Sequence, residues 1–184
     1  KKYAKLNLFL HDYFFAKSLD AVRPGGVLMF ISSAGTMNKV DATAREYLAD
    51  RADLVGAIRL PGNAFKENAG TEVTTDIVIL RKRLPGEVAG DRSWTETTEV
   101  TLPGPDGQPV TGAMSRYFAE HPEMVLGEQG FFDKLYQGRY AVRAAKDADI
   151  VSGLNKAIDR LPASIMSDWT TDKAASTQTD FTPT

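Results

Sequence analysis

The sequence of 184 residues contains no cysteine and only two histidines, His11 and His121, which lie far apart in the chain. The lack of cysteine excludes disulfide scaffolds and thiolate metal sites, and with so few histidines we expect no histidine-based metal site. No apolar run approaches the ~20 residues of a membrane span, and no signal peptide is visible. These absences predict a cytoplasmic protein that has no membrane partner.

A strong charge of either sign is also missing, since the formal net charge is -2. This balance provides no global attraction to nucleic acid, although it leaves room for a local basic patch. Hydrophobic residues make up 42% of the chain, which is enough for a packed core. The chain does not begin with methionine and enters an amphipathic stretch almost at once, so we expect it to be a piece of a longer protein.

The common catalytic motifs are absent as well. The sequence contains no GxSxG, no P-loop, no HExxH and no GxGxxG, and its acidic residues are scattered without a spacing that marks out a pair. Residue types alone therefore indicate only a piece of an α/β domain.

Hydrophobic periodicity predicts alternating elements in the first half of the chain. We expect helices at about 8–22 and 42–50, the second capped by Asp41 with an apolar stripe that includes Val40, and strands at 26–33, 52–61 and 72–83. The run GVLMFISS is typical of a strand buried on both faces. The first two strands, joined by a helix, should run parallel, and the last two, joined by about a dozen residues, should be antiparallel neighbours.

The second half of the sequence contains shorter elements. We expect a hairpin over 98–112, a short helix ending at Pro122, a strand near 138–144 and a helix over about 147–161. We divide the chain into residues 1–84, a linker at 85–96, an accessory region of hairpin and helices at 97–168, and a disordered tail at 169–184.

Two stretches carry a resemblance to a known family. HDYFFAKSLDAVRPGGVLMFIS and AREYLADRADLVGAIRLPGNAFKENAGTEVTTDIVILRKR resemble the second half of the catalytic domain of N6-adenine DNA methyltransferases. YFAEHPEMVLGE, from Tyr117 to Glu128, resembles a segment that follows this core in large methylase–helicase proteins of phages, plasmids and integrating elements. The resemblance implies the C-terminal half of a Rossmann-like sheet that binds S-adenosylmethionine, with an antiparallel last strand, followed by a small α+β segment.

The same resemblance implies an incomplete enzyme. The family's catalytic Asn/Asp-Pro-Pro-Tyr/Phe loop and its Gly-rich cofactor loop do not occur in the 184 residues. We therefore expect a part of a restriction–modification or mobile-element methyltransferase, inactive alone, whose complete form methylates adenine N6 in double-stranded DNA. An upstream half or a partner chain would supply the rest. The alternative is a non-catalytic interaction or scaffold module built on the same fold.

Two aromatic residues acquire roles through this resemblance. Phe14 occupies the position of the aromatic residue that flanks the cofactor's adenine, and the alternative is a core residue on an apolar helix face. Phe65, in the loop before the last strand, occupies the position of the aromatic residue that packs against the flipped target base. Stacking of this kind is worth ~1–3 kcal/mol per base. The alternative for Phe65 is a hydrophobic plug that pins the loop to the sheet.

Polar residues near Phe65 complete the expected site. Lys66 and Arg59 are candidates for phosphate contacts, with plain solvated charges as the alternative, while Gly70 and Thr71 would shape the pocket wall. The basic residues at 81–83 are expected to form a solvated strand end, with a phosphate contact as the alternative. Asp76 could be buried and paired. Trp94 and Trp169 are expected to pack rather than stack on a ligand. The strand at 26–33 would be an exposed edge, so we expect self-association or partner binding.

Overall fold

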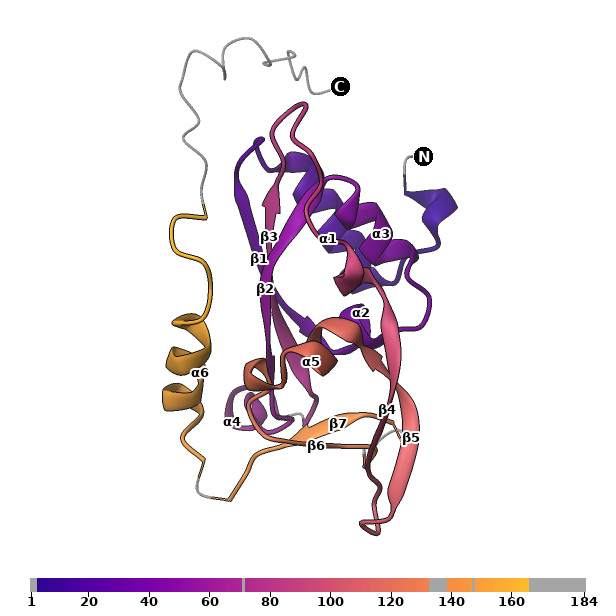
Figure 1. Ribbon diagram of the computed structural model, residues 1–184, viewed down its shortest axis with the longest axis vertical. Helices are drawn as coiled ribbons and strands as arrows, with labels where there is room; N and C mark the ends of the chain where they lie inside the picture. Colours follow the sequence, from indigo (N-terminus) through magenta and orange to yellow (C-terminus); the bar gives the residue numbers. More distant parts are fainter. Residues whose placement is uncertain (1–2, 71, 133–138, 147, 166–184) are drawn as a thin grey trace.

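The computed structural model describes residues 3–70, 72–132, 139–146 and 148–165, and it is a mixed α/β structure with small antiparallel sheets (Figure 1). The helices are α1 (Leu10–Ala21), α2 (Gly35–Asn38), α3 (Thr43–Ala49), α4 (Lys66–Ala69), α5 (Arg116–Glu120) and α6 (Ile150–Ile158). Short 3-10 turns are η1 (Ala4–Leu6), η2 (Ser93–Thr95) and η3 (Pro122–Met124). The strands are β1 (Val27–Ser33), β2 (Ala52–Leu60), β3 (Thr75–Lys82), β4 (Thr97–Pro103), β5 (Pro109–Ser115), β6 (Glu128–Gly130) and β7 (Ala141–Arg143).

The largest sheet has the strand order β1-β3-β2, and β3 runs antiparallel to both neighbours. The predicted antiparallel pairing of β2 with β3 is confirmed. The first and second strands run in the same direction, as predicted, but they are not neighbours because β3 lies between them. The long loop after β2 allows this arrangement, since it returns the chain to the centre of the sheet.

Helices α1 and α3 cover one face of this sheet (Figure 1). Phe15 of α1 packs edge-on against Phe30 of β1, with ring centroids 5.0 Å apart. On the opposite face, the segment after α6 packs closely on β2, where Leu161 Cδ2 lies 2.4 Å from the position of a Cβ built on Gly56. A side chain at Gly56 would therefore displace this contact.

Strand β1 has one open face. Met29 is 63% exposed and Ile31 is 56% exposed, so the prediction that residues 26–33 are buried on both faces is wrong. In the part of the chain that the structure describes, β1 is hydrogen-bonded to β3 alone, and its other edge is unpaired. The predicted exposed edge at this strand is thereby confirmed.

The hydrophobic core joins both halves of the chain. A single cluster contains Leu19 and Val78 from the first half together with Phe118 and Val142 from the second. Buried Trp94, 3% exposed, belongs to the same cluster, which confirms its predicted packing role. The large sheet and the smaller β4–β5 and β6–β7 ribbons thus share one interior.

Details at the ends of elements depart from expectation. Asp41 Oδ1 accepts a hydrogen bond from Thr43 N, 2.9 Å away, but the N-cap of α3 is Ala42, so the predicted cap is one residue off. Val40 precedes the helix and is 73% exposed, so its predicted place in the apolar stripe is wrong. The solvated strand end predicted at 81–83 is also wrong, because Arg83 donates to the carbonyl oxygens of Ala49 and Ala52.

The elements predicted for the second half are confirmed with shifted bounds. The hairpin extends over β4 and β5, α5 precedes Pro122, β7 forms part of the expected strand, and α6 lies within the expected helix. The predicted disordered tail and Trp169 lie outside the described residues. None of the described helices combines the length and the apolar character that crossing a membrane requires.

Candidate functional site

The loop at 61–74 connects β2 to β3 and contains α4. It lies at the end of the sheet where β1 and β2 both finish (Figure 1). Open α/β sheets bind ligands beyond the carboxyl ends of strands, because side chains and loops from several strands meet there. Four of the five residues that the sequence suggested for DNA contact belong to this loop, which makes it the first candidate for a functional site.

A buried ion pair closes the base of the loop. Arg59 on β2 and Asp76 on β3 face each other in the strand register, two residues outside the loop on each side. Arg59 Nε donates to Asp76 Oδ1 and Arg59 Nη2 donates to Asp76 Oδ2, each over 2.7 Å, and both side chains are fully buried. This two-point geometry is the strongest that an arginine and a carboxylate can form.

Neighbouring groups complete the surroundings of Arg59. Asn38 Oδ1 accepts from Arg59 Nη1 over 2.9 Å, and the guanidinium carbon lies 4.0 Å from the ring centroid of Phe118 and 4.9 Å from that of Tyr140. Burial alone would lower the pKa of Arg59, but the carboxylate of Asp76 more than offsets this effect and raises it. Arg59 is therefore a permanently charged structural residue.

This burial corrects one prediction and confirms another. Arg59 is 0% exposed, so the phosphate contact expected of it is wrong, as is its alternative as a solvated charge. The expectation that Asp76 is buried and paired is confirmed. The reason is positional, because Arg59 projects from the helix-covered face of the sheet, toward Phe118, and not from the open face.

Strand β7 joins the two stems of the loop. Gly62 N donates to Val142 O over 2.9 Å, and Val142 N donates to Thr74 Oγ1, also over 2.9 Å. Thr74 O in turn accepts from Ala34 N, at the end of β1, over 3.0 Å. One residue of β7 thus holds the entry and the exit of the loop at a fixed separation.

The tip of the loop carries the remaining expected site residues. Phe65 is half-buried and packs against the core cluster, which fits its alternative role as a plug, and its contact with a target base stays a prediction. Lys66 is exposed, and its Nζ lies 2.6 Å from Glu72 Oε1. Gly70 ends α4 with a φ of +63°, a left-handed conformation that favours glycine. Thr71 lies outside the described residues.

Phe14 occupies a different part of the molecule. It lies on the solvent side of α1, is 52% exposed and contacts Tyr13 edge-on, with ring centroids 5.8 Å apart. Its alternative as a core residue is therefore wrong, and the core position belongs to its neighbour Phe15, which is 1% exposed. The rings of Phe14 and Phe65 are not in contact.

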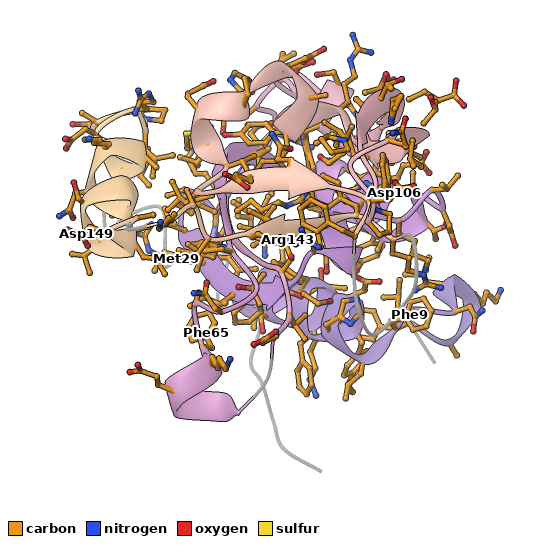
Figure 2. All side chains as sticks on the ribbon, turned by 90° about the horizontal axis from the view of Figure 1, so that it is seen from below. Phe9, Met29, Phe65, Asp106, Arg143 and Asp149 are labelled. Carbon is orange, nitrogen blue, oxygen red and sulfur yellow. The ribbon has the colours of Figure 1, made fainter. Side chains whose placement is uncertain are left out.

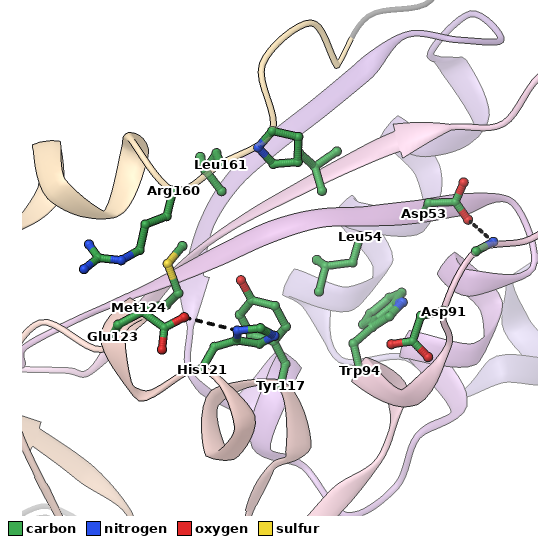
Figure 3. Close-up of a pocket in the computed structure, with 13 residues that line it drawn as sticks. Asp53, Leu54, Asp91, Trp94, Tyr117, His121, Glu123, Met124, Arg160 and Leu161 are labelled. Carbon is green, nitrogen blue, oxygen red and sulfur yellow. Dashed lines mark hydrogen bonds and ion pairs between the residues drawn. The ribbon is translucent and has the colours of Figure 1, made fainter.

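A separate hollow of about 460 Å³ lies between β2, α5 and the segment after α6 (Figure 3). Its charged side chains are engaged with neighbours: Asp53 accepts from Gly90 N over 3.0 Å, and His121 Nδ1 lies 3.2 Å from Glu123 Oε1. Burial raises the pKa of Tyr117, whose hydroxyl accepts from Ala57 N. These groups serve packing, so the loop remains the better candidate site.

Several residues of the site escaped sequence reasoning. They are Asn38, Thr74, Tyr140 and Val142. No motif marks them, because each acts through a partner distant in sequence, and only the apolar neighbours of Asp76 signalled a buried polar group. Within the described ranges no group of three histidine or acidic side chains is placed to hold a metal ion.

Comparison with family models, with curated proteins and with solved structures found no match to this chain.

Proposed function

We propose that this chain is part of an adenine-N6 DNA methyltransferase and contributes the last three strands of its S-adenosylmethionine-binding sheet. The observation that carries the proposal is the strand order β1-β3-β2, with a reversed middle strand and an unpaired β1 edge. The resemblance to the family implies such an ending of the sheet, with its last strand antiparallel.

The character of the β1 edge supports an incomplete sheet. Residues 24–38 carry no charged side chain, and Met29 and Ile31 are exposed on the open face. Natural edge strands are usually protected by charges, prolines or bulges, because unpaired strands aggregate. An unprotected edge is expected where further strands belong, whether they come from the parent protein or from a partner chain.

In the proposed enzyme, the described residues would bind the cofactor and orient the target adenine. Phe14, exposed on α1, is available to flank the cofactor's adenine, and Phe65 would meet the adenine extruded from the duplex. S-adenosylmethionine supplies the methyl group. The rigid base of the loop, built on Arg59 and Asp76, would hold Phe65 in place for in-line attack by N6.

The test is methyl transfer from radiolabelled S-adenosylmethionine to duplex DNA by the full parent protein, with the 184-residue chain alone as the comparison. We expect transfer to adenine by the parent, none by the chain alone, and a strong loss with Phe65→Ala. A parent protein that binds DNA but transfers no methyl group would contradict the proposal.

A non-catalytic scaffold module is the second candidate. The absence of both the Gly-rich and the Asn/Asp-Pro-Pro-Tyr/Phe motifs from the 184 residues favours it. Calorimetric titration of S-adenosylmethionine into the parent protein separates the two candidates. A scaffold should give no heat of binding. The enzyme should bind the cofactor, and Phe14→Ala should weaken this binding.

A further inference from the structure

Arg143 on β7 has an unusual environment. Its side chain is exposed, and its guanidinium carbon lies 3.6 Å from the centroid of the Phe132 ring. Within the described residues, its guanidinium has no hydrogen bond or ion pair. Nine other arginines do have such a partner: Arg23, Arg45, Arg51, Arg59, Arg81, Arg83, Arg92, Arg116 and Arg160.

Stacking on a ring prepares an arginine for a ligand. The aromatic face holds the guanidinium plane in one orientation, and at an exposed site the attraction is worth about 0.5–1 kcal/mol. The planar fork of donors matches the two oxygens of a phosphate, and less side-chain entropy is lost when it binds. Arg143 therefore has the geometry of a phosphate-binding group whose donors are not used within the described structure.

Arg143 also lies beside the candidate site. It follows Val142, whose backbone is hydrogen-bonded to both Gly62 and Thr74. Figure 1 shows β7 and α4 at the same end of the molecule, and Figure 2 looks at the molecule from that end, with Arg143 and Phe65 labelled. The backbone hydrogen bonds of Val142 thereby fix the separation of Arg143 from the loop.

The acidic groups near Arg143 leave its charge available. Glu128 stands opposite Arg143 in the β6–β7 register without forming an ion pair with it. On the loop, Glu72 is engaged by Lys66, while Glu67 is exposed on α4. The loop's own lysine is thus paired with Glu72, whereas Arg143 on β7 has no ion pair within the described residues.

We propose that β7 is a second wall of the DNA-binding surface and that Arg143 contacts a backbone phosphate next to the nucleotide bound by the loop. The inference rests on the proposed function, which makes double-stranded DNA the substrate. Phe65 would meet the extruded base while Arg143 holds the flanking phosphate, so that the backbone contact positions the duplex and carries no sequence information.

The experiment measures binding of a fluorescently labelled duplex to the full 184-residue chain by anisotropy, over a series of salt concentrations. Each phosphate contact contributes about -0.9 to the slope of log K against log salt. With Arg143→Ala we expect the slope to become less negative by about 0.9, equally for unrelated DNA sequences. Arg143→Lys should keep the slope and weaken binding, because it retains the charge but loses the two-point geometry.

The matched control is Arg23→Ala, which removes an exposed arginine just before β1, at the opposite end of that strand from the loop. It should leave the slope unchanged. An unchanged slope in Arg143→Ala, or no DNA binding by the chain even at low salt, would overturn the inference. A changed slope in Arg143→Ala, combined with no methyl transfer by the parent protein, would support the inference and refute the proposed enzyme function, so the two failures are distinguishable.

Discussion

Replacing Asp76 by asparagine tests the role of the buried ion pair at the base of the loop. The substitution keeps the shape of the side chain but removes its charge, and it leaves the guanidinium of Arg59 fully buried without a carboxylate. Removing one partner of a buried pair costs about 3–5 kcal/mol, because the remaining charge cannot return to water. This is a large share of the ~5–15 kcal/mol that stabilises an ordinary domain.

Urea unfolding provides the assay. With a slope of about 2 kcal/mol per molar urea, the loss corresponds to a fall of about 1.5–2.5 M in the unfolding midpoint at an unchanged slope. Asp50→Asn is the matched control, since Asp50 forms an exposed pair with Arg92 at 2.9 Å. Exposed pairs contribute less than about 1 kcal/mol, so the control midpoint should hardly move.

A double variant separates the charge from the shape of the site. Arg59→Met combined with Asp76→Leu replaces the pair by apolar side chains, and such replacements are often neutral or stabilising. We therefore expect the double variant to recover most of the stability that Asp76→Asn loses. A loss below about 1 kcal/mol in Asp76→Asn would show that water reaches Arg59, and the reasoning from burial would be refuted.

Three further predictions concern the loop stem, an N-terminal tyrosine and the open edge. Thr74→Val leaves the buried N–H of Val142 without its acceptor and should cost about 1–3 kcal/mol, measured by urea unfolding, whereas an unchanged midpoint would contradict the bridge. The hydrogen bond to Asp20 raises the pKa of Tyr3 from 10.0 to about 12, so its stabilising effect is present below pH 10 and is lost as the pH rises through about 12; ultraviolet titration should show Asp20→Asn returning Tyr3 toward 10.0. Self-association through β1 should disappear with Ile31→Lys in light scattering, and a monodisperse wild-type monomer would count against it.

The positions of the strands in the large sheet were predictable because the apolar runs are long and are bounded by glycine, proline or charged residues. Their burial was harder to predict, since β1 has the apolar composition that is usual in a central strand although it lies at an edge of the sheet. Met29 and Ile31 are residues typical of a strand that is covered on both faces. They are nevertheless exposed, because no described element packs on them. Periodicity describes a strand by itself, whereas coverage is a property of the assembled layers.

The site was predictable only where it is local. The loop was predicted because glycine and polar residues surround the aromatic ring of Phe65, a pattern contained within a few positions, and the role of Phe65 in base contact stays a prediction. The role of Arg59 depends on the register that places it opposite Asp76, and that of Val142 depends on a contact across about 70 residues. Such contacts leave no trace in a single sequence, so a buried arginine was mistaken for a solvated one.

The ion pair between Arg59 and Asp76 also explains how the register of β2 and β3 is defined where the loop begins. Register in β2 and β3 shifts between Leu54 and Gly56, so the pairing beyond this irregularity must be specified again. A slip of one residue would place Arg59 opposite Thr75 or Ile77 and leave two buried charges apart, at a cost of several kcal/mol. The pair therefore selects one register at the point where the loop begins. Compared with apolar residues in the same place, the ion pair contributes little net stability. Its contribution is to fix the register of the two stems on which the candidate site depends.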